Sequence, residues 1–382
     1  MLDGLETVDR LAANALGGAV GVVEVVLVFE SLEFGELLVK LAVRHERLGL
    51  FVVGPVGQVQ ALAEFGHALG YVFAGHRQRS SRAVTLRPMP RAITIDGKAI
   101  ASQVKAGIAR RVKALNDKGF DVRLDAILVT DEKNTAAHVY AKNQKRSCNQ
   151  LGIDYVLHEL KGSSTYEDIA GRVLLLNKNI EAHAIMVHMP LPEGVDPFRV
   201  QSLIDPEKDV EGVNPANIGN IVYARSSLAP CTAMAAVKLI NSTGIDLKGK
   251  RCVVVGASNI VGKPIAVMLM KPEATVISCN KYTENLPELA SSADVVVAAA
   301  GVPHLVKKSW IKPGAIVIDV GIHRVPLDEP KPDGTKMRTV GDVDEEVAEV
   351  AGHLTPVPGG VGPVTVAMLL ENVVTAAELH HQ

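Results

Sequence analysis

Short apolar segments alternate with amphipathic segments from residue 92 to the end of the chain, and this alternation limits the folds open to it. In the first amphipathic segment, apolar residues recur at helical spacing at Ile100, Val104, Ile108 and Val112. The apolar segment RLDAILVT follows and predicts a buried strand. Repeated pairs of this kind are typical of parallel βαβ units, so we predict an α/β protein.

The pattern continues in two series of segments. In the first, AAHVYAKNQKRSCNQLG predicts a helix that ends at a glycine, and the strands IDYVLHEL and AHAIMVHMPLP enclose a further helix. In the second, RCVVVG, ATVISC, ADVVVAAAG and AIVIDVG are continuously apolar, as strands are when helices cover both faces of a parallel sheet. At 382 residues the chain is long enough for two domains.

Charge and composition exclude several classes of partner. A net charge of −2 provides no basic field for a nucleic-acid backbone, so we expect no nucleic-acid partner. The apolar run at 19–29 is interrupted by Glu24 and is shorter than the roughly 18 residues of a membrane span, so we expect no membrane partner. The four cysteines form no CxxC pair and no metal-binding spacing, which favours reduced thiols in a cytoplasmic protein without a metal.

The first ninety residues differ in composition from the rest. Residues 1–90 contain one lysine and seven arginines, whereas the remainder contains 21 lysines and 11 arginines. One interpretation is a small extra domain, and the other is a gene start assigned too far upstream. We favour the second, which N-terminal sequencing of the native protein would contradict by finding these residues.

The segment VVVGASNIVGKP has the strand, glycine loop and helix order of a dinucleotide-binding turn. Its loop amides and helix N-terminus can hold a pyrophosphate, because both favour an anion. Gly256 and Gly262 are six apart, with Ser258 between them, so the spacing is not that of GxGxxG, and a purely structural turn stays open. The next strand leads to Lys281 without an acid before Glu284, which favours NADP over NAD.

Six segments together resemble the methylenetetrahydrofolate dehydrogenase/methenyltetrahydrofolate cyclohydrolase family. They are DEKNTAAHVYAKNQKRSC, VHMPLPEG, DPEKDVEGVNPANIG, GASNIVGKP, GAIVIDVGI and LTPVPGGVGPVTVAMLLEN. The resemblance runs from about residue 92 to 380 and implies two α/β domains around a cleft, usually in a homodimer. It implies a three-layer folate-binding domain at 91–229 and 355–382, and a Rossmann-like NADP domain at 230–354.

The implied chemistry has two steps. Hydride moves from the methylene carbon of 5,10-methylenetetrahydrofolate to NADP, a step for which positioning and electrostatics supply most of the catalysis. Water then attacks the methenyl carbon, and this cyclohydrolase step requires proton transfer.

The resemblance also implies three sets of site residues. Catalytic roles fall to Tyr140, Gln144 and His188. Folate contacts are expected from Tyr140, Glu211, Pro358, Gly359, Gly360, Val361, Gly362, Pro363 and Thr365. NADP contacts are expected from Thr232, Gly256, Ala257, Ser258, Ile260, Val261, Gly262, Lys281, Gly301 and Ile322.

Independent chemistry supports two of the folate-binding segments. The loop PVPGGVGPVT combines glycines that permit close approach with rigid prolines, as a flat ligand requires, although a hinge between domains has the same features. Glu211 is placed to bind the pterin amino group, although a solvated loop acid fits the same sequence.

The chain departs from the family pattern at the centre of the expected site. Gln144 stands where the family has lysine, His188 where it has glutamine, Glu211 where it has aspartate, and Ala233 where it usually has proline. At about 100° per residue, Gln144 shares the helix face of Tyr140, whereas the neighbouring lysines point about 140° to 200° away. No neighbouring amine therefore replaces the missing lysine.

Glutamine cannot take a proton from water, so we predict retained dehydrogenase activity with weak or absent cyclohydrolase activity. An alternative is that His188 serves as a relocated base and preserves both steps. Another is a pocket adapted to a different pterin by Glu211. Two rival classes stay open: a non-catalytic folate- or nucleotide-binding paralogue, and an oxidoreductase acting on a small hydroxy or amino acid.

Overall fold

The computed structural model describes residues 25–31, 37–43, 48–53, 59–65, 91–130, 136–327 and 336–381. The chain divides into two units, Met1–Pro88 and Met89–Gln382. In the first unit, β1 (Val25–Ser31), β2 (Leu37–Val43), β3 (Leu48–Val53) and β4 (Val59–Phe65) pair as an antiparallel sheet. The predicted loop DEKNT at 131–135 lies outside the described residues.

The first lobe of the second unit is built on a three-stranded parallel sheet in the order β7-β6-β8. These strands are β6 (Arg123–Val129), β7 (Asp154–Leu160) and β8 (Ala184–Val187). Side chains of β6 alternate between two cores, because Leu124 and Ala126 face one side while Ile127 and Val129 face the other. This alternation produces the predicted three layers.

Helices cover the two faces of this sheet. One core contains residues of α4 (Tyr166–Lys178) and α5 (Pro197–Gln201). The other contains residues of α2 (Gly97–Asn116), α3 (Ala136–Asn149) and α10 (Val361–His380). The predicted glycine end of α3 is confirmed: Gly152 has a φ of 76°, and the Ile153 amide reaches back to the Cys148 carbonyl at 3.0 Å.

The second lobe contains a six-stranded parallel sheet in the order β10-β9-β11-β12-β15-β5. Its strands are β5 (Ile93–Thr94), β9 (Arg251–Val255), β10 (Thr275–Cys279), β11 (Val295–Ala298), β12 (Ile316–Asp319) and β15 (His353–Leu354). The four central strands are the four predicted for the second series. β5 lies in the segment predicted for the folate domain, yet it pairs with β15 in this sheet.

The sheet of the second lobe is also covered on both faces. α7 (Cys231–Asn241) and α8 (Gly262–Met270) share one core with α10. On the other face lie α9 (Leu286–Ser291) and the short turns η1 (Lys308–Trp310) and η2 (Glu345–Glu349). α6 (Pro215–Val222) contacts α8, and β13 (His323–Pro326) pairs with β14 (Met337–Val340) in a hairpin that the apolar pattern did not predict.

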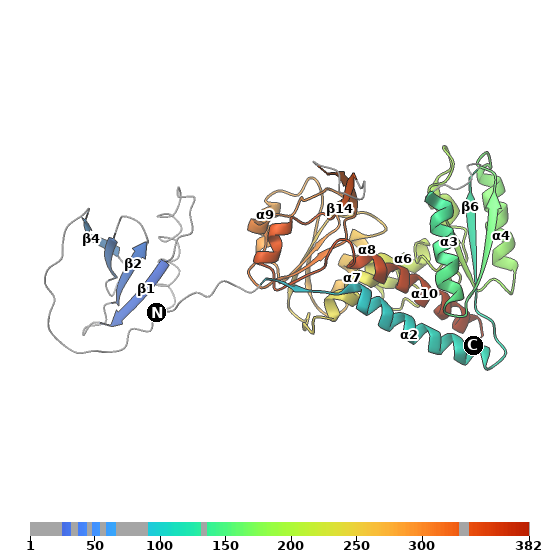
Figure 1. Ribbon diagram of the computed structural model, residues 1–382, viewed down its shortest axis with the longest axis horizontal. Helices are drawn as coiled ribbons and strands as arrows, with labels where there is room; N and C mark the ends of the chain where they lie inside the picture. The colour runs from blue at the N-terminus through green and yellow to red at the C-terminus, as the bar shows by residue number, and fades with distance from the viewer. Residues whose placement is uncertain are drawn as a thin grey trace. The chain divides into compact units, whose positions relative to one another are not determined.

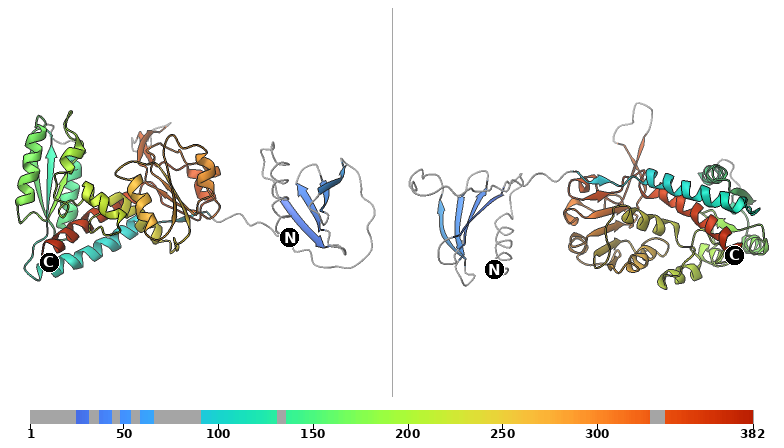
Figure 2. Two further views of the ribbon diagram at one scale, coloured as in Figure 1. Left: turned by 180° about the vertical axis from the view of Figure 1, so that it is seen from behind. Right: turned by 90° about the horizontal axis from the view of Figure 1, so that it is seen from below.

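Two long helices join the lobes. Figures 1 and 2 show α2 and α10 side by side, and α10 also packs on α7. At their start, a Cβ on Gly97 would lie 1.9 Å from the Gly360 carbonyl oxygen, so only glycine permits this approach. Further along, Arg111 binds the Glu378 carboxylate through two hydrogen bonds of 2.9 and 2.6 Å. One apolar core therefore runs through both lobes.

The helix α10 has the length and apolar composition that a membrane span needs. However, 61% of its apolar window is buried inside the protein, mainly against α2 and α7. This burial is that of a core helix.

A buried amide on α10 connects three segments. The Asn372 side chain is 1% exposed, and its Nδ2 donates to the Val210 carbonyl at 2.8 Å and the Ala229 carbonyl at 3.0 Å. Neither strand nor helix hydrogen bonds satisfy these two loop carbonyls. A buried carbonyl without a donor is costly, so Asn372 fixes the loops at 210 and 229 against α10.

We predict that Asn372→Ala lowers the free energy of unfolding by about 2–3 kcal/mol, because two buried carbonyls lose their donor. Urea denaturation followed by circular dichroism measures this change. The control is Asn149→Ala at the exposed end of α3, which should change stability by less than about 0.5 kcal/mol. Equal effects of the two substitutions would contradict the role given to Asn372.

Candidate functional site

A cavity of about 320 Å³ opens beside the carboxyl end of β8 and the start of α7. Segments from both lobes form its wall. The lining residues are Tyr140, Met186, Val187, His188, Met189, Glu211, Val213, Pro230, Cys231, Thr232, Ile260, Thr365, Val366 and Leu369. Ligands of parallel α/β sheets bind outside the carboxyl ends of the strands, which is where this cavity lies.

The cavity brings together six of the residues predicted for the site. Tyr140, His188, Glu211 and Thr365 come from the predicted catalytic and folate sets, and Thr232 and Ile260 come from the predicted cofactor set. Sequence reasoning missed the remaining lining residues, which are mostly apolar and carry no motif of their own. Cys231 is the polar one among them, and its thiol contacts the Val210 carbonyl at 3.2 Å.

His188 follows directly after β8 and is buried. Its Nε2 lies 3.1 Å from the Tyr155 hydroxyl of β7, and its ring meets the Tyr140 ring edge to face at 5.9 Å. Burial lowers the pKa of His188 to about 4. The imidazole is therefore neutral at pH 7 and is a weaker base than an exposed histidine.

Glu211 lies on the opposite side of the pKa scale. Burial raises the pKa of its carboxyl group to about 7, and the nearby charge of Asp209 contributes to this rise. One carboxyl oxygen, Oε2, is buried and has no hydrogen-bond partner. Buried polar atoms without a partner are rare in folded proteins, and this one belongs to a residue of the cavity wall.

The loop that carries Glu211 is held from both sides. Asp209 accepts hydrogen bonds from the Gly212 and Asn214 amides at 3.1 and 2.7 Å. Gly212 has a φ of 67°, and a Cβ there would lie 2.1 Å from the Ala229 carbonyl carbon. A glycine is required at this position because of both conformation and space.

Gln144 is buried on α3 one turn after Tyr140, and its Oε1 has no hydrogen-bond partner. It does not line the cavity in this structure. Lys142 and Lys145 line a shallow groove on the outside of α3 together with Arg146, which confirms that they point away from Tyr140. Its assignment to the reacting face therefore stays a prediction.

The glycine-rich loop at 358–363 leads into α10 and does not line the cavity. Gly359 has a φ of 113°, and Gly360 packs against Gly97 at the start of α2. Val361 is buried, and its carbonyl accepts a hydrogen bond of 3.1 Å from the Thr365 hydroxyl. The loop thus places Thr365 in the cavity wall, and its own contacts to a folate stay a prediction.

The predicted cofactor turn has a cradle that only glycines permit. Gly256 has a φ of 112°, and a Cβ on it would lie 2.1 Å from the Ala299 carbonyl oxygen. A Cβ on Gly262 would lie 1.9 Å from the Gly256 carbonyl oxygen, so the two glycines touch despite their spacing of six. The Ser258 hydroxyl accepts weak 3.3 Å hydrogen bonds from the Val261 and Gly262 amides at the start of α8. These features suit a pyrophosphate.

The other predicted cofactor residues surround this turn at the carboxyl edge of the sheet. Lys281 is exposed after β10, with its ammonium group 4.9 Å from the Tyr282 ring centre. Gly301 follows β11, Ile322 follows β12 and is exposed, and Ala257 lies within the turn itself.

Sequence reasoning missed a buried acid that orders this edge. Asp342 Oδ2 accepts hydrogen bonds from the Ala300 and Gly301 amides at 2.7 and 2.8 Å. Its Oδ1 lies 2.7 Å from His323 Nε2. Asp319 holds the Asp342 amide at 2.9 Å, and burial raises the pKa of Asp319 to about 6. Asp342 therefore positions the loop that carries Gly301, and only the fold reveals this because the two segments lie 41 residues apart.

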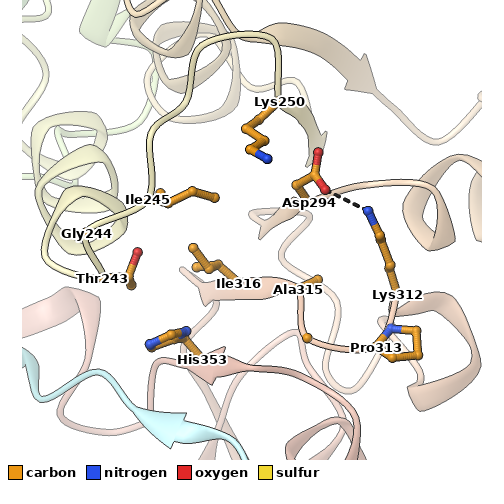
Figure 3. A pocket seen from close by; sticks show the side chains of 11 residues that line it. Thr243, Gly244, Ile245, Lys250, Asp294, Lys312, Pro313, Ala315, Ile316 and His353 are labelled. Carbon is orange, nitrogen blue, oxygen red and sulfur yellow. Dashed lines mark hydrogen bonds and ion pairs between the residues drawn. The ribbon is translucent and has the colours of Figure 1, made fainter.

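A second hollow lies at the opposite end of the same sheet (Figure 3). Lys250, Asp294 and Ala315 come just before β9, β11 and β12, so this hollow is at the amino ends of the strands. Its Lys312 and Asp294 form an ion pair of 2.7 Å. Ligands of such sheets bind at the carboxyl ends, which assigns the site to the first cavity. The described residues contain no cluster of three metal-binding side chains.

Comparison with known proteins covers the second unit. Residues 95–211 match the tetrahydrofolate dehydrogenase/cyclohydrolase catalytic domain, and residues 230–381 match the tetrahydrofolate dehydrogenase/cyclohydrolase NAD(P)-binding domain. The chain is 42% identical over 285 residues to the bifunctional protein FolD of Pelobacter propionicus, covering 74% of this chain and 97% of that protein. It is 43% identical over 284 residues to FolD of Moorella thermoacetica, covering 74% and 98%.

Solved structures give the same relationship. The Campylobacter jejuni FolD methylenetetrahydrofolate dehydrogenase/cyclohydrolase is similar with a TM-score of 0.70 and 37% identity, covering 75% of this chain and 99% of that one. The Trypanosoma brucei FolD, solved with NADP cofactor and inhibitor, has a TM-score of 0.70 and 36% identity, covering 77% and 100%.

We predict that Asp342→Asn raises the dissociation constant of NADP at least tenfold, which is about 1.4 kcal/mol. The amide cannot accept from the Ala300 and Gly301 amides and keep the His323 contact unchanged. Isothermal titration calorimetry measures the affinity. The control is Asp344→Asn, because Asp344 pairs with Lys307 at 3.0 Å instead of holding the loop. Unchanged NADP affinity in Asp342→Asn would contradict the positioning role.

Proposed function

The chain belongs to the tetrahydrofolate dehydrogenase/cyclohydrolase family and is an NADP-dependent 5,10-methylenetetrahydrofolate dehydrogenase, and we propose that its cyclohydrolase step is weak or absent. The observation that carries this proposal is the composition of the cavity. Tyr140 and Glu211 of the predicted folate set share one wall with Thr232 and Ile260 of the predicted cofactor set. A shared cavity is what hydride transfer between the two ligands requires.

The dehydrogenase step needs little from the side chains of the cavity beyond placement. When bound, NADP supplies the acceptor for the hydride. The folate nitrogens stabilise the cation that remains, so no strong base is needed at this step. The Gly256 and Gly262 cradle and the Asp342-ordered loop are placed to hold the dinucleotide, and Lys281 is placed for the ribose phosphate.

The cyclohydrolase step depends on a proton acceptor that the family supplies as a lysine. The described residues that line the cavity include no lysine and no arginine. Gln144, at the family lysine position, has no titratable group. Water activation is therefore impaired, whereas hydride transfer is not.

His188 does not support the alternative of a relocated base. Its Nε2 is engaged with the Tyr155 hydroxyl, and burial lowers its pKa to about 4. General bases work best when their pKa lies near the working pH. The non-catalytic alternative is disfavoured because the cofactor cradle and the cavity are both intact.

We further propose the finer assignments that the family resemblance implies. The folate-binding segment comprises 91–229 and 355–382, and the NADP segment comprises 230–354. Glu211 recognises the pterin, the protein is cytoplasmic, and it acts as a homodimer.

The first test measures NADPH formation from NADP and 5,10-methylenetetrahydrofolate, together with hydrolysis of 5,10-methenyltetrahydrofolate. We expect clear NADPH formation and hydrolysis close to the uncatalysed rate. Gln144→Lys should raise hydrolysis at least about tenfold, because a positioned base contributes roughly 10²–10⁴.

The matched control is Lys145→Gln on the outer face of α3, which should leave both rates unchanged. No NADPH formation with the methylene substrate would favour a different pterin. Fast hydrolysis by the unmodified protein would contradict the impaired cyclohydrolase step.

A further inference from the structure

We propose that Glu211 is the proton-transfer group of the hydrolysis that remains in this enzyme, in place of the family lysine that Gln144 replaces. This inference rests on the proposed function, because it assumes that the cavity binds the methenyl substrate. It assigns to Glu211 a catalytic role in addition to pterin recognition.

Placement is the first support for this role. Glu211 lines the cavity, and its Oε2 is buried without a hydrogen-bond partner. Its neighbours in the chain are held, because Asn372 binds the Val210 carbonyl at 2.8 Å and Gly212 packs against Ala229. The carboxyl group is therefore presented by a rigid loop with one oxygen available to a ligand or a water molecule.

The charges around Glu211 favour a carboxyl group that exchanges protons near neutral pH. The titratable groups that face it are Asp209, Tyr140, Cys231 and His188. None of them is a permanent cation, and Asp209 opposes a second negative charge. Burial and this charge raise the pKa of Glu211 to about 7, so acid and carboxylate coexist at neutral pH.

The other titratable groups of the cavity wall are less suitable. His188 is engaged with Tyr155 and its pKa is lowered to about 4. Burial raises the pKa of the Cys231 thiol well above its usual value, and that thiol contacts the Val210 carbonyl. Burial also raises the pKa of Tyr140, so its hydroxyl stays protonated.

The proposed step balances as follows. The Glu211 carboxylate takes a proton from water while the water oxygen forms a bond to the methenyl carbon, and the electron pair of the C=N bond returns to nitrogen. The bond from this carbon to one nitrogen then breaks, and that nitrogen receives the proton from the Glu211 acid. The hydroxyl proton passes to solvent as the C=O bond forms. Glu211 returns to its carboxylate form, and one proton is released for each formyl product.

The test follows hydrolysis of 5,10-methenyltetrahydrofolate by absorbance between pH 5.5 and 8.5, with the uncatalysed rate subtracted. We expect a low rate at saturating substrate that rises with pH and levels above about pH 7, because the carboxylate is the active form. Glu211→Gln should lower this rate at least about tenfold and remove its pH dependence. His188→Asn should keep the pH dependence.

Glu207→Gln is the matched control, because Glu207 is an exposed acid on the same loop outside the cavity. It should retain the rate and the pH profile. NADP affinity, measured on each variant, verifies that the fold is intact. If Glu211→Gln does not fold, the pH profile of the unmodified protein still decides.

Three results would overturn the inference: a rate independent of pH, an unchanged rate in Glu211→Gln, or no hydrolysis above background by a protein that binds the methenyl substrate. The assay contains no NADP, so its failure is distinct from that of the proposed dehydrogenase. If NADPH formation fails while pH-dependent hydrolysis persists, the proposed function is wrong and the role of Glu211 stands.

Discussion

The arrangement of the site depends on one buried amide. Asn372 projects from an apolar helix into the core, where burying an amide is costly unless it is fully hydrogen-bonded. Its two acceptors are the carbonyls next to Glu211 and Pro230, which lie on the two sides of the cavity. One side chain thereby sets the distance between the loop that faces the folate and the helix that begins at the cofactor side. The same apolar core encloses both lobes, so this distance is a property of the whole unit.

The substitutions change the charge of the cavity as well as its proton chemistry. A lysine in a buried site would repel a cationic methenyl group, whereas Glu211 in its carboxylate form attracts it, and both effects are strong where water is excluded. Replacing lysine by Gln144 removes the repulsion. The described cavity wall therefore favours the cation formed by hydride transfer more than a family site with its lysine does. An enzyme with this wall is suited to form the methenyl product and to hold it.

The sequence predicted the fold where local pattern decides structure. The strands β9 to β12 are apolar runs, α2 has its four apolar residues on one buried face, and Gly152 ends α3. The hairpin β13–β14 was missed because its polar strands lack an apolar run. For the site, motifs identified residues such as Tyr140 and Glu211. The roles of Asn372 and Asp342 depend on contacts across 162 and 42 residues, which no local pattern encodes.

The pairing of β5 with β15 has a mechanical consequence. These neighbouring parallel strands lead directly into α2 and α10, which also lie side by side, so the connection between the lobes is a doubled strut rather than a single flexible linker. A change in the angle between the lobes must bend both strand-to-helix junctions together. One of these junctions is the glycine-rich loop that leads to Thr365 in the cavity wall. Opening and closing of the cleft would therefore strain that loop directly, and its rigidity limits how far the two ligands can move apart.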